Sequence, residues 1–191
     1  MKKIYIILLI LFFGCETRFS PKPKGYLRIE LEPKIQALME PKECPFSFNL
    51  PDYFALNYKS QKNCWIDLTY PKHKATIHIT YKKINNNLFQ LLEESRQMAY
   101  KHTVKADAIN EQLYSNKINS TYGKLYNIQG ETASSVQFHL TDSANHFIRG
   151  SLYFSVQPNQ DSLRPIVNYL REDIILMMES LQWNDGVSSL Q

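Results

Sequence analysis

The chain has 191 residues, about the length of one domain, with 43% hydrophobic and 21% charged residues. This composition excludes a disordered tail, a collagen-like repeat and a protein with several membrane spans. The formal net charge is only +4, whereas a nucleic-acid-binding domain usually carries a denser basic patch. Aromatic residues make up 13% of the chain and only six residues are glycine, which favours half-buried sheet surface over glycine-rich phosphate loops.

The first fifteen residues indicate secretion and lipid attachment. Two lysines precede an unbroken apolar run over residues 4–13, which is too short to cross a hydrocarbon core of about 30 Å and is typical of a signal peptide. Gly14 and Cys15 follow at once, as in a bacterial lipobox. We therefore predict a lipoprotein signal peptide over residues 1–14 and a Cys15 that carries acyl chains such as palmitate. The alternatives are an ordinary signal peptide with an incidental cysteine and an uncleaved N-terminal anchor.

A short tether separates the anchor from the domain. Residues 16–25 contain Pro21 and Pro23 among basic side chains and almost no apolar residues, so they cannot fold alone. A proline-containing linker extends by about 3.1 Å per residue and would hold the domain up to roughly 30 Å from the membrane. We predict a lipidated tether over residues 15–25, a single globular domain over residues 26–183 and a flexible tail over residues 184–191.

The cysteines agree with this location. Once Cys15 is lipidated, Cys44 and Cys64 remain, and the oxidising cell envelope permits a disulfide between them. Such a bridge would contribute about 3 kcal/mol in the chain-entropy model; two buried free thiols are the alternative. We expect a lipid-anchored membrane protein that faces the periplasm, and the sequence leaves open which membrane holds the lipid.

The first half of the domain has the alternation of antiparallel strands. Apolar and polar residues alternate over residues 26–31, 46–50, 64–70 and 77–81. Residues 35–39 are expected to form a helical turn. An apolar stripe of period 3.6 then predicts a helix over residues 88–102.

The second half repeats this order. Residues 108–114 are ambiguous between strand and helix, and strand composition returns over residues 122–128, 135–141 and 147–156. A continuous apolar stripe from Leu163 to Leu181 predicts the final helix, with Asp161 or Ser162 as its cap.

The hairpin between the last two predicted strands has a register that the sequence specifies. If residues 143–145 form a three-residue loop, Leu140 faces Ile148 on an apolar side of the sheet. His139 then lies opposite Arg149 on the other side.

Strands, helix, strands and helix in this order predict the α+β class, with an antiparallel sheet and two main helices packed on it. Residues 46–51 and the final helix running into residues 180–183 resemble PsbP/Mog1-like domains, which is an analogy of fold only.

Neither a metal site nor a catalytic group can be derived from these residues. His139, Asp142 and His146 are close in sequence, but the hairpin would point them apart and no further ligand completes the set. The serines lack a nucleophile-elbow motif. We expect no cofactor, no metal, no nucleic-acid partner and no enzymatic activity. The alternatives are a ligand-binding lipoprotein with an aromatic cleft and, less favoured, an envelope hydrolase; the cleft would be lined by Trp65, Tyr81 and Tyr153.

Seven segments in order resemble the gliding-motility lipoprotein GldD family. They are residues 21–29, 44–46, 64–72, 99–103 with 105–108, 133–138 with 140–143, 147–154 and 161–183. The resemblance implies a component required for surface gliding that assembles with or stabilises other envelope proteins of the gliding and type IX secretion apparatus. It supplies no catalytic residue. The candidate partner-surface residues are Lys101, His102, Lys105, Asp107, His139, Asp142 and Arg149.

Overall fold

The computed structural model describes residues 31–101, 105–156 and 160–184. Cys15, the tether, His102 and the tail beyond residue 184 lie outside these residues, so the predictions for them stay predictions. The same holds for the strand expected over residues 26–31, apart from Leu31, which lies in no strand.

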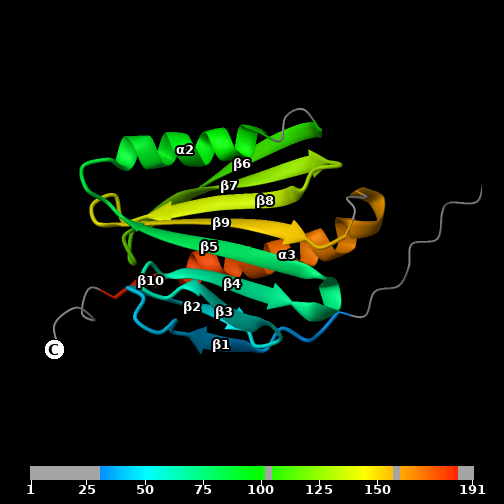
Figure 1. The fold of residues 1–191 in the computed structure, drawn as a ribbon, viewed down its shortest axis with the longest axis horizontal. Helices are drawn as coiled ribbons and strands as arrows, with labels where there is room; N and C mark the ends of the chain where they lie inside the picture. The colour runs from blue at the N-terminus through cyan, green and yellow to red at the C-terminus, as the bar shows by residue number, and fades with distance from the viewer. Residues whose placement is uncertain (1–30, 102–104, 157–159, 185–191) are drawn as a thin grey trace, which may run out of the picture.

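Seven antiparallel strands form the main sheet (Figure 1), in the order β3-β4-β5-β9-β8-β7-β6. The strands are β3 (Ala55–Ser60), β4 (Trp65–Tyr70), β5 (Ala75–Lys83), β6 (Ala106–Asn116), β7 (Thr121–Gly130), β8 (Ser134–Thr141) and β9 (His146–Phe154). A short 3-10 turn, η1 (Pro71–His73), joins β4 to β5. The ambiguous segment therefore forms the edge strand β6, and β3, which we did not predict, forms the opposite edge.

A second sheet contains β1 (Gln36–Met39), β2 (Phe46–Pro51) and β10 (Gln182–Trp183), in the order β1-β2-β10. The helical turn predicted over residues 35–39 is wrong, because Ala37 pairs with Leu50 in an antiparallel ladder. Five residues are too few to distinguish a helical from a strand period. Trp183 pairs with Phe46, so the chain returns to the first part of the domain after its last helix.

The two helices pack on opposite faces of the main sheet. Helix α2 (Leu88–Tyr100) contacts β8 and β9, and helix α3 (Gln160–Ser180) contacts β8 and β2. Side chains alternate along a strand: Leu140 of β8 belongs to the core that α3 completes, whereas the preceding His139 bonds to α2. The fold is α+β with large antiparallel pairing, as predicted.

The register predicted for the β8–β9 hairpin is confirmed. Leu140 pairs with Ile148, and His139 pairs with Arg149. Phe138 lies opposite Gly150, and a Cβ atom at position 150 would overlap the Phe138 ring. The glycine is needed here because the aromatic ring occupies the space of its missing side chain.

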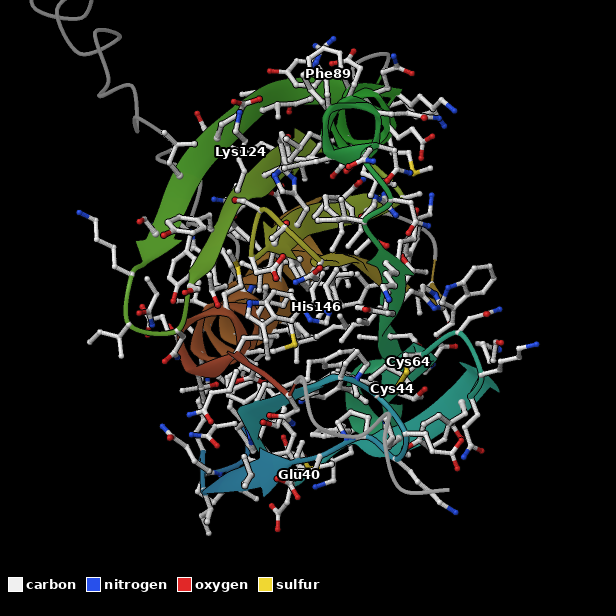
Figure 2. All side chains as sticks on the ribbon, turned by 90° about the vertical axis from the view of Figure 1, so that its left-hand side faces the viewer. Glu40, Cys44, Cys64, Phe89, Lys124 and His146 are labelled. Carbon is white, nitrogen blue, oxygen red and sulfur yellow. A yellow bond between two sulfur atoms is a disulfide. The ribbon has the colours of Figure 1, made fainter. Side chains whose placement is uncertain are left out.

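A disulfide joins Cys44 to Cys64, the pairing that the sequence analysis favoured. Cys44 lies just before β2 of the small sheet and Cys64 just before β4 of the main sheet. The bond therefore connects the two sheets at one end of the shared core (Figure 2).

Candidate functional site

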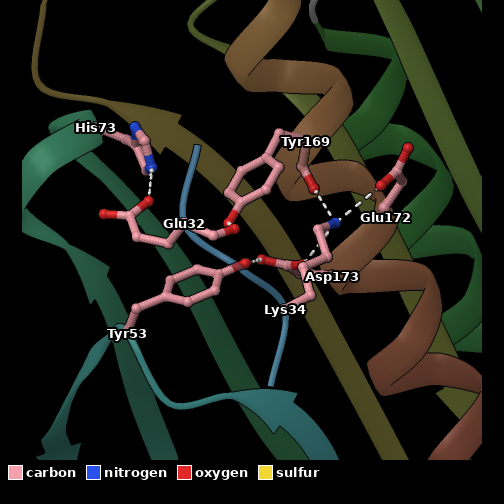
Figure 3. A network of polar contacts seen from close by, with 7 residues as sticks. All are labelled: Glu32, Lys34, Tyr53, His73, Tyr169, Glu172 and Asp173. Atoms are coloured by element: carbon pink, nitrogen blue, oxygen red, sulfur yellow. Dashed lines mark hydrogen bonds and ion pairs between the residues drawn. The ribbon is translucent and has the colours of Figure 1, made fainter. Parts of the chain in front are cut away.

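The start of the described chain is held against α3 by a polar network, here called the N-terminal clamp: Glu32, Lys34, Tyr53, His73, Tyr169, Glu172 and Asp173 (Figure 3). Lys34 is its centre. The Lys34 Nζ atom donates hydrogen bonds to the Tyr169 carbonyl at 3.0 Å and to Glu172 Oε2 at 2.9 Å. It also forms an ion pair with Asp173 Oδ1 at 2.9 Å. One ammonium group thus contacts three groups on a single turn of α3.

The rest of the clamp surrounds this ammonium group. The Tyr53 hydroxyl donates a hydrogen bond to Asp173 Oδ2 at 2.6 Å, so both oxygens of this carboxylate have a partner. The Tyr169 hydroxyl donates to the Glu32 carbonyl oxygen at 2.8 Å. The Glu32 carboxylate in turn contacts His73 Nε2 at 3.1 Å. Residues from four separate parts of the chain therefore converge where the predicted tether would join the domain.

Charges in the clamp are stabilised by one another. The Asp173 side chain has no exposed surface, and burial raises the pKa of its carboxyl group although hydrogen bonds from Tyr53 and Lys34 oppose this shift. Burial also disfavours the Lys34 ammonium, but its bonds to Glu172 and Asp173 outweigh that effect and raise the pKa of Lys34. The hydrogen bond from Lys34 lowers the pKa of the exposed Glu172. Lys34 is therefore charged at neutral pH.

Sequence reasoning did not find this clamp, although one signal was present. Asp173 falls within the apolar stripe of the last helix, three residues after Leu170 and four before Met177, and all three side chains are buried. A carboxylate on the buried face of a helix requires a cationic or hydrogen-bonding partner. The sequence could not identify Lys34 as that partner, because the two residues are far apart along the chain.

The predicted partner-surface residues lie in three separate places. Lys101, Lys105 and Asp107 are exposed at the two ends of the connection from α2 to β6; we call these three residues the α2–β6 corner. Asp142 lies in the β8–β9 turn, where its Oδ1 atom accepts hydrogen bonds from the backbone N–H groups of residues 144, 145 and 146. These bonds lower its pKa against the effect of burial, which gives Asp142 a structural part in the turn.

His139 and Arg149 lie on the sheet face next to α2. His139 is only 5% exposed, and its ring stacks against Phe147 with the centroids 5.8 Å apart. Burial is the main effect that lowers the pKa of His139 to about 4, so the ring is neutral at pH 7. Arg149 donates a hydrogen bond to Gln137 Oε1 at 2.7 Å, and burial lowers the pKa of its guanidinium. His139 thus contributes to packing beneath α2 and offers little surface to a partner.

A serine–histidine pair is present beneath α2, where the Ser95 hydroxyl lies 3.1 Å from His139 Nδ1. Ser95 is only 3% exposed and lies in the middle of α2, where backbone N–H groups are used within the helix and cannot form an oxyanion hole. Among the described contacts of His139 there is no hydrogen bond to a carboxylate that could orient its ring. The geometry is that of two buried polar groups that satisfy each other.

The three aromatic residues proposed for a ligand cleft do not line one cavity. Trp65 borders a pocket of about 160 Å³ beside α2. Tyr81 packs against Phe46 in the core that α3 completes, and Tyr153 packs against His78. Among the described residues, no group of three or more histidine, cysteine, aspartate or glutamate side chains is placed to hold a metal ion. Neither helix in the described chain is long and apolar enough to cross a membrane.

These features define a class of protein: a single-chain α+β fold with antiparallel sheets, a helix on each face of the larger sheet and a disulfide between the sheets. The sequence matches the family described as gliding motility lipoprotein GldD over residues 16–183. The chain therefore belongs to this family of gliding-motility lipoproteins, and a lipoprotein is held at a cell-envelope membrane by its lipid.

A search of curated proteins finds no match. Among solved structures, the solution structure of cyanobacterial PsbP (CyanoP) from Synechocystis sp. PCC 6803 is similar to the chain. The TM-score is 0.49 at 9% sequence identity, and the alignment covers 85% of this chain and 99% of that chain. The α+β class stated above rests on the strands and helices themselves.

Proposed function

We propose that this protein is a non-catalytic component that assembles or stabilises the gliding and type IX secretion apparatus, acting by contact with other envelope proteins. The observation that carries the proposal is the family match over residues 16–183. The match begins directly after Cys15. This start supports a signal peptide over residues 1–14 and lipidation of Cys15. It also supports a folded domain over residues 26–183 that faces the periplasm.

The N-terminal clamp supports this proposal because it joins the tether end of the domain to helix α3. A domain held by a lipid at Cys15 and bound to a partner elsewhere would carry any pulling force through residues 31–35. In the clamp, Lys34 ties this segment to Glu172 and Asp173 of α3, and α3 is packed into the main core through Leu170 and Ile174. Force applied at the tether would therefore reach a rigid element rather than peel away β1.

The α2–β6 corner is the partner surface that we favour. Lys101, Lys105 and Asp107 are exposed, whereas His139 is buried and Asp142 is engaged in a turn. Exposed charges at a contact chiefly steer association and select the partner. Reversing the two lysine charges should therefore weaken binding without unfolding the domain.

The test is cross-linking in intact cells followed by identification of the proteins joined to the full-length chain. We expect motility or secretion proteins to be recovered with the unaltered protein and to be depleted with Lys101→Glu/Lys105→Glu. The matched control is Lys62→Glu/Lys117→Glu, which makes the same charge change at two exposed turn positions. Recovery of no motility or secretion protein with the unaltered chain would contradict the proposed function.

The anchor has a separate test. Cys15→Ala should release the domain from the membrane fraction or block its maturation, because the acyl chains supply the binding energy, roughly 0.8 kcal/mol for each buried CH₂ group. Membrane fractionation and mass analysis of the N-terminus measure both outcomes. A Cys15→Ala protein that is cleaved normally and stays in the membrane would show that the lipid is attached elsewhere.

A further inference from the structure

Strand β6 forms one edge of the main sheet (Figure 1), and no other strand of the described chain pairs with its outer side. An edge strand presents a row of backbone N–H and C=O groups that can pair with a further strand. After a register shift between Ala106 and Ala108, residues 108–116 pair with β7 without interruption. The outer side of β6 therefore offers a long and regular ladder to a second strand.

The two edges of the main sheet are built differently. The opposite edge strand, β3, has six residues, a register shift between Tyr58 and Ser60, and the side chain of Lys59, which is 66% exposed. Short length, bulges and lysine side chains protect an edge strand from pairing with another chain. Strand β6 has eleven residues and contains neither lysine nor proline. Its regular part, residues 108–116, therefore lacks the protection that β3 has.

The side chains of this ladder favour contact with another strand. Leu113 is 80% exposed, although it lies within the ladder and not in a turn. The charge of Glu111 is already compensated, because its carboxylate accepts a hydrogen bond from the Tyr100 hydroxyl at 3.0 Å and forms an ion pair with Lys124 at 2.6 Å. Residues 108–116 thus combine an exposed leucine with a carboxylate that would not repel an incoming strand as a free charge would.

A second copy of the same chain fits this edge by symmetry. Two identical strands pair in antiparallel fashion about a two-fold axis only when paired residues point their backbone groups the same way. The two residue numbers in each pair then add up to an even number, and the axis passes through one residue. An axis at Gln112, the centre of residues 108–116, pairs the whole regular ladder with its copy.

The side chains are complementary in this register. Gln112 lies opposite its own copy, and each amide carries both donors and an acceptor. Glu111 lies opposite Leu113 of the second copy, so that no like charges face each other. At the ends of the ladder, the exposed Asp107 of one copy lies opposite the exposed Lys117 of the other. Such an exposed pair sets the register more than the affinity, so a change at Lys117 alone leaves the ladder in place.

We propose that two copies of this protein associate through β6, antiparallel about a two-fold axis at Gln112, and join their main sheets into one continuous sheet. The axis is perpendicular to the sheet, so the face covered by α3 in one copy continues as the face covered by α3 in the other. Both N-terminal clamps lie against α3, and both predicted tethers would therefore reach the same membrane. This inference goes beyond the proposed function, because one copy could bind the gliding apparatus whether or not two copies pair.

The test uses single-cysteine variants of the full-length protein in isolated membranes. In Gln112→Cys the new thiol faces its own copy, because directly opposed Cα atoms in an antiparallel pair are about 4.5–5.5 Å apart, a separation that a disulfide can span. Mild oxidation should convert this variant into a covalent dimer on non-reducing electrophoresis. We expect roughly tenfold or more dimer than in the controls, because pairing raises the effective concentration of one thiol at the other.

Two controls separate specific pairing from chance collision. Asn57→Cys places a thiol at an exposed position of the opposite edge strand, β3. Ser115→Cys places one at an exposed position of β6 itself, but there it opposes Ile109 of the second copy, about 20 Å along the strand from the second Ser115. Neither control should give more dimer than the unaltered protein. The proposal is overturned if either gives as much dimer as Gln112→Cys, or if position 112 is joined to a different protein in place of a second copy.

A charge change tests the same contact from the neighbouring position. Adding Leu113→Asp to Gln112→Cys places a carboxylate opposite Glu111 of the second copy and should reduce the dimer several-fold, because like charges directly opposite each other are destabilising. The matched control is Phe89→Asp, which makes the same kind of change at an 82% exposed residue of α2 and should leave the dimer unchanged. Thermal unfolding shows whether each variant is folded. An equal yield of dimer with both changes would overturn the proposal.

Discussion

The two faces of the main sheet are built from alternate residues of the same strands, but they differ in character. The face toward α3 belongs to one continuous apolar cluster that also includes β2 and the disulfide. On the face toward α2, the apolar contacts fall into two small clusters, and buried polar side chains such as Gln137, His139 and Ser151 lie between them. The comparison indicates that the α3 face supplies most of the stability, whereas the α2 face depends on hydrogen bonding between polar groups.

The largest expected effect on the free energy of unfolding comes from truncating a buried side chain on the α3 face. Phe138 is fully buried in the main cluster, so Phe138→Ala should lower the free energy of unfolding by about 3–5 kcal/mol through lost burial and the cavity left behind. Urea unfolding measures this change. Leu91→Ala, in the small cluster beneath α2, is the comparison and should cost less. An equal loss for both variants would contradict the difference between the faces.

Removing the disulfide should have the next largest effect. Cys44 and Cys64 are 20 positions apart in sequence, so replacing both by alanine should cost about 3 kcal/mol, because the unfolded chain regains the freedom of that loop. The loss should appear in urea unfolding of the oxidised protein and vanish when unaltered and variant proteins are compared under reducing conditions. A variant as stable as the oxidised protein would show that the bond adds little.

On the α2 face, the buried His139 should make stability depend on pH. Its folded-state pKa of about 4 lies below the ordinary histidine value of 6.5, chiefly because the ring is buried. As the pH falls below about 6.5, the unfolded state takes up a proton that the folded state does not. Stability contributed by this residue is therefore complete above pH 6.5 and declines by about 2–3 kcal/mol toward pH 4.

Unfolding free energies measured from pH 7 to pH 4 test this expectation. His139→Gln should have a flatter profile than the unaltered protein over this range, whatever its stability at pH 7. The same slope in both proteins would show that other groups cause the pH dependence.

The smallest effect is expected on the outer surface of α2. Arg96 lowers the pKa of Glu93 to about 2 through a hydrogen bond, but both side chains are accessible to water. Exposed ion pairs are screened by solvent, so Glu93→Gln should leave the unfolding temperature within experimental error. A clear drop would show that this pair is more important to α2 than its exposure suggests.

Local patterns predict the regular elements well where the periodic segment is long and turn or capping residues mark its ends. The β8–β9 hairpin was placed in register because Leu140 and Ile148 could face each other only if residues 143–145 formed the loop. The final helix was clear from its apolar stripe. Short or weakly apolar segments are not clear from the sequence. The four residues of β1 are too few to distinguish a strand from a helical turn, and β3 has no apolar face because residues 55–60 are largely exposed.

The candidate sites were harder to predict because their residues meet only in three dimensions. The disulfide was an exception, since only two cysteines remained once Cys15 was assigned to the lipid. Lys34 and Asp173 meet because the N-terminal segment passes along α3. Spacing along the chain carries no information about such pairs.

By itself, the sequence determined the α+β class, the alternation of the central strands and the apolar stripe of each helix, and it predicted a lipoprotein signal at the N-terminus. These depend on interactions between residues close in the chain, where strand and helix periods act directly. Only the tertiary structure decided which face each helix covers, which charges pair in the clamp and which strands form the edges of the main sheet. These depend on how distant segments pack, and the free energy of packing is shared among many contacts that no single stretch of sequence contains.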